Sequence, residues 1–122
     1  MAQANMPDTT ACRPLSEALA KIGDKWTILI AMELEDGPKR FSALQRSVEG
    51  ISQRMLALTL RGLERDGFVE RTVYPTKPPS VDYALTDLGR EMAVPVRELG
   101  SWVTENLIRI EQARLKFDAS SD

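Results

Sequence analysis

Apolar residues recur every three or four positions through the first third of the chain, a spacing typical of amphipathic helices. The first such helix is predicted to begin at Pro14, where the missing N–H of proline costs nothing, and to end at Gly23. Asp24 is a suitable cap for a second helix, Lys25 to about Leu34, whose apolar residues nearly surround it. A helix that is apolar on almost all sides belongs in the centre of a core.

The next segment has the pattern of two helices separated by a tight turn. A helix is predicted over about Phe41–Val48, followed by a turn at Glu49–Gly50. A longer helix follows over about Gln53–Asp66, with Ser52 as a suitable cap and Gly67 as a suitable end. Two helices joined by a short turn that contains glycine form the helix-turn-helix pattern.

After this pair of helices the periodicity changes from helical to strand-like. Residues 68–74 and 81–85 have the composition of strands, and a proline-rich loop from Pro75 to Ser80 separates them. A hairpin directly after the second helix of a helix-turn-helix is a wing.

A long last helix is predicted after the wing. Thr86 is a suitable cap, and apolar residues at spacings of three and four extend from Leu88 to Ile110, with a kink expected at Pro95. This stripe has more apolar surface than one small domain covers, so we expect two chains to pair as a homodimer through their terminal helices. The residues expected at this interface are Leu15, Leu19, Met92, Leu99, Trp102 and Val103.

These elements predict a fold class that is mainly α-helical with a small β-hairpin wing, a winged helix-turn-helix. One such domain, with its dimerisation helices, is expected over residues 12–110. Residues 1–11 are polar and unpatterned and are expected to form a flexible N-terminal segment. Residues 111–122 are expected to be a C-terminal extension whose tail, from Phe117, is frayed.

Composition narrows the classes of function. The chain has 122 residues, no histidine and one cysteine, Cys12, which excludes a Cys/His zinc site and a nucleophile–histidine pair. Acidic residues are scattered among basic ones, and the seven glycines are single and dispersed, so neither a carboxylate pair nor a phosphate loop is indicated. We expect no enzyme, no metal and no cofactor. Without a membrane-length apolar run or a signal peptide, the expected location is the cytoplasm.

Charge is unevenly distributed along the chain. The net charge is −2, yet residues 39–61 hold five basic residues and one acidic residue, and so carry +4 against −6 for the remainder. A basic face on an acidic body suits a protein that contacts nucleic acid with one surface. A solvated pair of helices with mixed charge gives the same pattern, so charge alone leaves both interpretations open.

The helix predicted over about Gln53–Asp66 is the candidate reader of DNA. Gln53 and Arg54 lie at its start, where a recognition helix reaches base edges, and their side chains suit adenine and guanine respectively. Ala57 is small enough for close approach to the groove, and Arg61 is placed to meet a phosphate. The residues expected to contact DNA are Lys39, Arg40, Ser52, Gln53, Arg54, Ala57, Arg61 and, on the wing loop, Lys77.

Several short runs together resemble the HxlR-type family of bacterial transcription regulators. The runs are IGDKWT at 22–27, RFSAL at 40–44, GISQRML at 50–56, LERDG at 63–67 and PPSVDYALTDLG at 78–89. The resemblance covers about residues 12–103. It implies a dimeric winged helix-turn-helix protein that represses or activates transcription and contacts DNA through the helix that follows Ser52 and through the wing.

The resemblance also bears on Cys12, since several members of this family sense quinones, aldehydes or oxidants through a cysteine just before the first helix. Arg13 and the positive end of a helix that begins at Pro14 would both lower the pKa of the Cys12 thiol. Many relatives have cysteine and proline adjacent, whereas here Arg13 separates them. Because each chain has one cysteine, any disulfide must join two chains or a chain and a small thiol.

The sequence therefore predicts a sequence-specific DNA-binding transcriptional regulator, with double-stranded operator DNA and a second copy as partners and no membrane. A response to an oxidant or electrophile through Cys12 is one hypothesis, and a bystander thiol is the other. Two further alternatives stay open. One is a regulator gated by a small apolar effector between the first and last helices, and the other is a winged-helix protein–protein adaptor.

Overall fold

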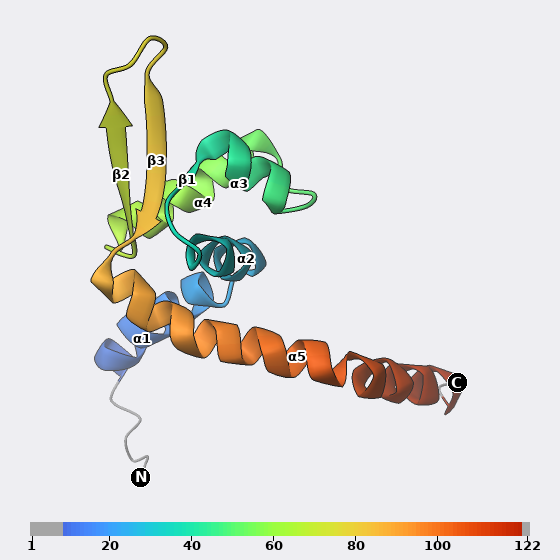
Figure 1. The fold of residues 1–122 in the computed structure, drawn as a ribbon. Coiled ribbons are helices and arrows are strands. Elements are labelled where there is room, and N and C mark those ends of the chain that lie inside the picture. The colour runs from blue at the N-terminus through green and yellow to red at the C-terminus, as the bar shows by residue number, and fades with distance from the viewer. Residues whose placement is uncertain (1–8, 121–122) are drawn as a thin grey trace.

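The computed structural model describes the backbone of residues 9–120 and the side chains of residues 13–120. The elements are α1 (Thr9–Ile22), α2 (Lys25–Leu34), β1 (Lys39–Arg40), α3 (Phe41–Ser47), α4 (Gln53–Arg65), β2 (Val69–Tyr74), β3 (Ser80–Leu85) and α5 (Asp87–Ser120). Figure 1 shows α3, α4 and the β2–β3 hairpin on one side of α2, with α1 and α5 on the other. The predicted fold class, mainly helical with a small β wing, is confirmed.

Side-chain caps and left-handed glycines set the ends of these helices. The side-chain oxygens of Asp24, Ser52 and Thr86 each accept a hydrogen bond, 3.0 Å long, from a backbone N–H in the next helical turn. Gly50 in the turn between α3 and α4 has φ +86°, and Gly67 after α4 has φ +84°. Because this region of φ strains other residues, the predicted turn and helix end depend on glycine.

The core lies where the helix-turn-helix packs on α2. Its largest fully buried side chains are Ile30, Leu44, Leu56, Leu60 and Leu63, which come from α2, α3 and α4. Val69 and Leu85 of the hairpin are also buried and pack against this cluster. The position of α2 in the centre follows the prediction from its nearly continuous apolar surface.

The first helix differs from its prediction. It begins at Thr9, so Pro14 lies inside it and the predicted start at Pro14 is wrong. A proline near a helix N-terminus removes one backbone hydrogen bond, here to the carbonyl of Thr10, and the turn before it can still form. Cys12 is consequently in the first turn of α1 and not in front of it. Its side chain lies outside those that the structure describes.

The sheet has a third strand that the sequence pattern did not predict. β1 pairs antiparallel with β3, with Lys39 opposite Tyr83 and Arg40 opposite Asp82. The strand order is β1-β3-β2. Two residues are too few to show an alternating pattern, so only the strand that they pair with reveals them.

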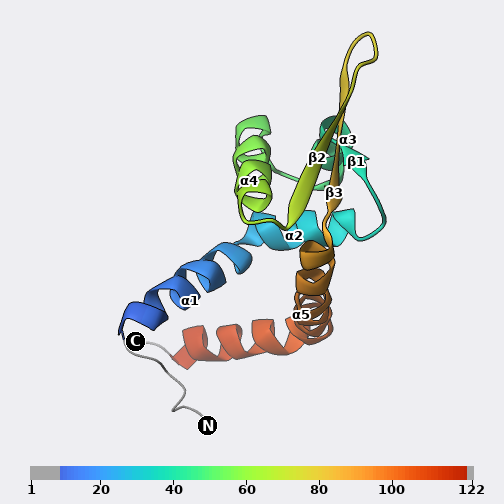
Figure 2. The ribbon, with the colours of Figure 1, turned by 90° about the vertical axis from the view of Figure 1, so that its left-hand side faces the viewer.

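The last helix is longer than its apolar stripe. It continues through Pro95 to Ser120, so Phe117 to Ser120, expected to be frayed, are helical. Figure 2 shows that α5 is bent, because its red C-terminal part runs in a different direction from the part beside α2. Neither α5 nor any other helix within residues 9–120 has a sufficiently long apolar stretch to cross a membrane.

The start of α5 is joined closely to the start of β2. The Thr86 N–H donates to the carbonyl of Phe68 at 3.0 Å, and the Thr86 hydroxyl donates to the carbonyl of Gly67. Gly89 is buried one turn later, where a Cβ atom would collide with that same Phe68 carbonyl. The close approach of the two elements therefore requires glycine at position 89.

Ser52→Ala should lower the free energy of unfolding by about 1 kcal/mol, because the Met55 N–H loses its hydrogen-bond acceptor. Ser52→Asp keeps an acceptor at the same place and should retain the stability of the wild type. Urea denaturation followed by circular dichroism measures both differences. Equal stability of all three proteins would mean that this cap contributes nothing.

Candidate nucleic-acid interface

α4 presents a basic stripe to solvent. Its three buried leucines fix the orientation of the helix, since they lie on the side that faces α2 and α3. At 100° per residue, Arg54, Arg61 and Arg65 lie on the opposite side, within about 40° of one another. All three side chains are exposed. We call these three arginines the α4 basic stripe.

The predicted base readers lie at the free end of this helix. Gln53 and Arg54 are exposed in the first turn of α4. Figure 2 shows that this end of α4 and the tip of the hairpin both point away from α2 and α5. The Ser52 hydroxyl is occupied as the cap acceptor and can still donate its proton. Ala57 is only half exposed.

A hollow of about 660 Å³ separates α4 from the sheet. Ala57 borders it, and Arg61, Arg65 and Arg71 bring three positive charges to it. The nearest acid to Arg71 is Glu64, with 3.8 Å between Arg71 Nε and Glu64 Oε2, which is too long for a hydrogen bond. Exposed pairs at such a distance contribute little, so these arginines can still bind an anion.

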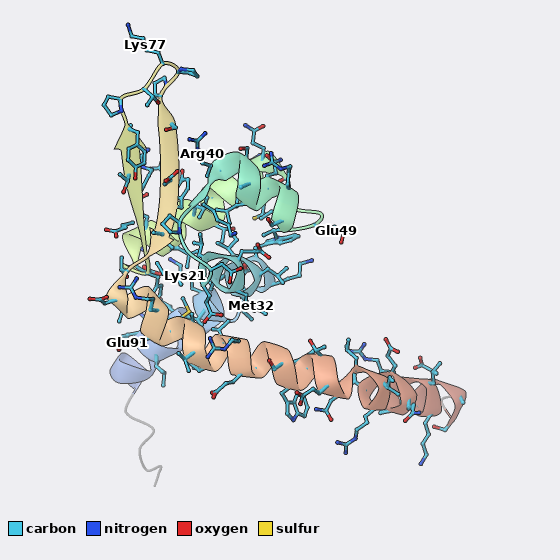
Figure 3. The ribbon with its side chains drawn as sticks, viewed as in Figure 1. Lys21, Met32, Arg40, Glu49, Lys77 and Glu91 are labelled. Carbon is cyan, nitrogen blue, oxygen red and sulfur yellow. The ribbon has the colours of Figure 1, made fainter. Side chains whose placement is uncertain are left out.

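The remaining predicted cations lie on the sheet. Lys77 is at the tip of the wing, and Arg40 lies between the wing and α3 (Figure 3). Arg40 is exposed, and its Nε is 3.9 Å from Oδ1 of Asp82 on the neighbouring strand. Lys39 is half buried beside Tyr83. The wing and β1 thus extend the basic surface beyond α4.

Two basic residues of this surface were not predicted. Arg65 is not among the predicted contacts because it lies in the last turn of α4, far from the end that reaches base edges, although a helical wheel places it about 20° from Arg54. Arg71 is not among the predicted contacts, because a strand pattern does not tell which helix lies beside the strand. Arg71 lies next to α4 because the sheet packs against that helix.

The terminal helices expose apolar side chains in the single chain. Five of the six residues predicted at the dimer interface are exposed, namely Leu15, Leu19, Leu99, Trp102 and Val103. Met92 instead packs with Ala31 and Val96, since α2 covers that side of α5. An apolar hollow of about 520 Å³ also lies between α1, α2 and α5, bordered by residues such as Leu19, Ile28 and Leu99.

Residues 21–111 match the family described as HxlR-like helix-turn-helix. The uncharacterized HTH-type transcriptional regulator YtfH of Escherichia coli (strain K12) is 41% identical over 101 residues, which cover 83% of this chain and 80% of YtfH. The structure of the putative transcriptional regulator ytfH from Salmonella typhimurium has a TM-score of 0.79 at 42% identity, and the match covers 83% of this chain and 90% of that one. The structure of the redox regulator HypR in its oxidized form has a TM-score of 0.71 at 42% identity, and the match covers 76% of this chain and 96% of that one.

Proposed function

The chain belongs to the HxlR-like helix-turn-helix family and is a transcriptional regulator of that type, and we propose that it binds operator DNA as a homodimer. The observation that carries this proposal is the α4 basic stripe beside a projecting wing. In the proposed complex α4 enters the major groove, and the wing contacts the flanking backbone or minor groove. A regulator of this kind acts on chromosomal DNA, which favours the cytoplasm.

The residues proposed to contact DNA divide into two roles. Gln53 and Arg54, at the free end of α4, read base edges, since an arginine can bind guanine O6 and N7 with two hydrogen bonds. The others bind phosphates and set the register of the protein on the duplex. These phosphate ligands are Lys39, Arg40, Ser52, Arg61, Arg65, Arg71 and Lys77. Ala57 leaves room for the helix to approach the groove.

The dimer is proposed to form through the exposed apolar side chains of α1 and α5. Leu99, Trp102 and Val103 lie on α5 near Gly100, which is the part of α5 beside Met32 of α2, and Leu15 and Leu19 lie on α1. A two-fold axis between the chains would present two α4 helices to two half-sites. These half-sites would lie about one turn of the DNA helix apart, which is roughly 10 base pairs, or a multiple of that spacing.

The proposal is tested by selecting duplexes from a random pool with the full-length protein. We expect an enriched, two-fold symmetric sequence that binds two chains. If six phosphates are neutralised, affinity for it should fall roughly 1,000-fold between 50 and 200 mM salt. An adaptor for another protein would enrich no sequence, and its weak duplex binding would show no such salt dependence.

Lys77→Ala should weaken binding to the selected duplex and to unrelated duplexes by the same factor, because Lys77 is assigned to a phosphate. The slope of log affinity against log salt should become shallower by about 1 for each chain. Fluorescence anisotropy at four salt concentrations measures both effects. A loss confined to the selected duplex would contradict this role and place the wing at a base edge.

We also propose that Cys12 responds to oxidants or electrophiles. The support is the similarity to HypR, a redox regulator, and the presence of Cys12 in α1, the helix that carries Leu15 and Leu19 toward the proposed interface. A covalent change there would alter the angle between the two chains and hence the spacing of the two α4 helices.

Diamide should change operator binding by the wild type and leave Cys12→Ser unaffected. Diamide is reduced while two thiols are oxidised to a disulfide, so the product joins two chains or a chain and a small thiol. Anisotropy and non-reducing mass spectrometry follow the two events. If an apolar effector in the 520 Å³ hollow is the signal instead, Cys12→Ser will respond to that effector like the wild type. If diamide affects both proteins alike, Cys12 is a bystander.

A further inference from the structure

One exposed apolar side chain lies directly beside the α4 basic stripe. Leu58 is 53% exposed. At 100° per residue it is about 40° from Arg54, 60° from Arg61 and 20° from Arg65 around the helix. It therefore points outward with the arginines, away from the buried leucines of the same helix.

A single exposed leucine is ordinary on a protein surface and carries no meaning by itself. The position of Leu58 is what distinguishes it, because it follows Arg54 by four residues and so lies one turn farther along the face proposed to enter the groove. The other exposed apolar residue of α4, Met55, is 39% exposed and lies about 60° farther round. Both border a hollow of about 500 Å³ between α1 and α4, but only Leu58 also lies directly beside the stripe.

We propose that Leu58 reads the C5-methyl group of one thymine in each half-site. Thymine alone among the four bases presents a methyl group in the major groove, and apolar side chains recognise it by contact. Arginines supply hydrogen bonds and charge but leave this methyl group unrecognised. The inference rests on the proposed function, since it requires α4 to lie in the major groove.

The spacing along α4 locates the thymine. Four residues of helix rise about 6 Å, which corresponds to about two base-pair steps of 3.4 Å. The thymine should therefore lie within about two base pairs of the base pair that Arg54 contacts. Arg54→Ala identifies that base pair independently, because preference is lost there.

The test replaces each thymine of the selected duplex with deoxyuridine, which removes only the methyl group. For the wild type, replacing the thymine in one half-site should weaken binding about fourfold, as expected for one buried methyl group, and replacing it in both half-sites should weaken binding about 15-fold. Leu58→Ala should bind the thymine and uracil duplexes equally within twofold. Met55→Ala is the matched control and should retain the full effect of uracil. Thermal denaturation checks that both variants are folded, as their exposure leads us to expect.

The outcomes separate this inference from the function that it rests on. Failure to enrich any duplex overturns both. An enriched duplex that the wild type binds equally with thymine and uracil at every position overturns the role of Leu58 alone. So does a uracil effect of equal size in Leu58→Ala, because another residue must then read the methyl group. An effect lost in Met55→Ala and kept in Leu58→Ala would assign the reading to Met55 and contradict the proposal.

Discussion

Replacing Leu99 and Val103 together with glutamate should convert the proposed dimer into monomers and lower operator affinity by about 100- to 10,000-fold. Both side chains are exposed in the single chain, at 53% and 37%, so the change should leave the fold intact. In a dimer they would be buried, and an unpaired buried carboxylate costs several kcal/mol. Affinity falls because each monomer would bind one half-site independently. In a dimer, binding of one chain holds the other chain close to the second half-site.

Sedimentation velocity measures the oligomeric state, and anisotropy with the selected duplex measures the affinity. The matched control is Ser101→Glu with Gln112→Glu, which adds the same charge to exposed positions on the opposite side of α5. The control should remain dimeric and bind normally. If the Leu99/Val103 variant still sediments as a dimer at micromolar concentration, α5 is not the interface.

Arg54→Ala should cost about 1–3 kcal/mol at one base pair in each half-site and should relax the preference for that base pair. The reason is that an arginine bound to guanine through two hydrogen bonds loses both with its side chain. Affinities for the selected duplex and its single-base variants measure the effect. Arg54→Lys keeps the positive charge but loses the planar guanidinium that donates two hydrogen bonds. Compared with Arg54→Ala, it should therefore recover the salt-dependent part of the affinity but not the base preference.

Arg61→Ala is the comparison within the same helix. It should weaken all duplexes alike and reduce the salt slope, because Arg61 is assigned to a phosphate. Unchanged affinity and preference in Arg54→Ala would mean that the first turn of α4 does not read bases. The proposed division of roles between these two arginines would then be wrong.

The parts of the fold that follow from local chemistry could be predicted from the sequence. Asp24, Ser52 and Thr86 cap helices because a short oxygen-bearing side chain precedes each apolar run. The three leucines of α4 are buried because their spacing places them on one side of the helix. Both signals are contained in fewer than 15 consecutive residues.

What could not be predicted depends on contacts between distant segments. The two residues of β1 become a strand only because β3 lies beside them. Arg71 joins the basic surface because the sheet packs on α4, and Met92 is removed from the exposed stripe because α2 covers it. Pro14 was misleading for a different reason, since a proline at the start of a helix and one in its second turn look the same in sequence.

Gly89 also sets how the wing is connected to the last helix. The absence of a side chain there lets α5 begin directly against the carbonyl of Phe68, while α2 covers the next turns of α5. The base of the wing and the start of α5 are thus held against each other, and in the proposed dimer α5 would connect each wing to the other chain. In that dimer, a signal that changes the distance between the two α4 helices would have to act at the contact between the two chains. A substitution that loosens one chain, such as one at Gly89, should therefore make the response to the signal less sharp without changing the distance between the α4 helices that the signal produces.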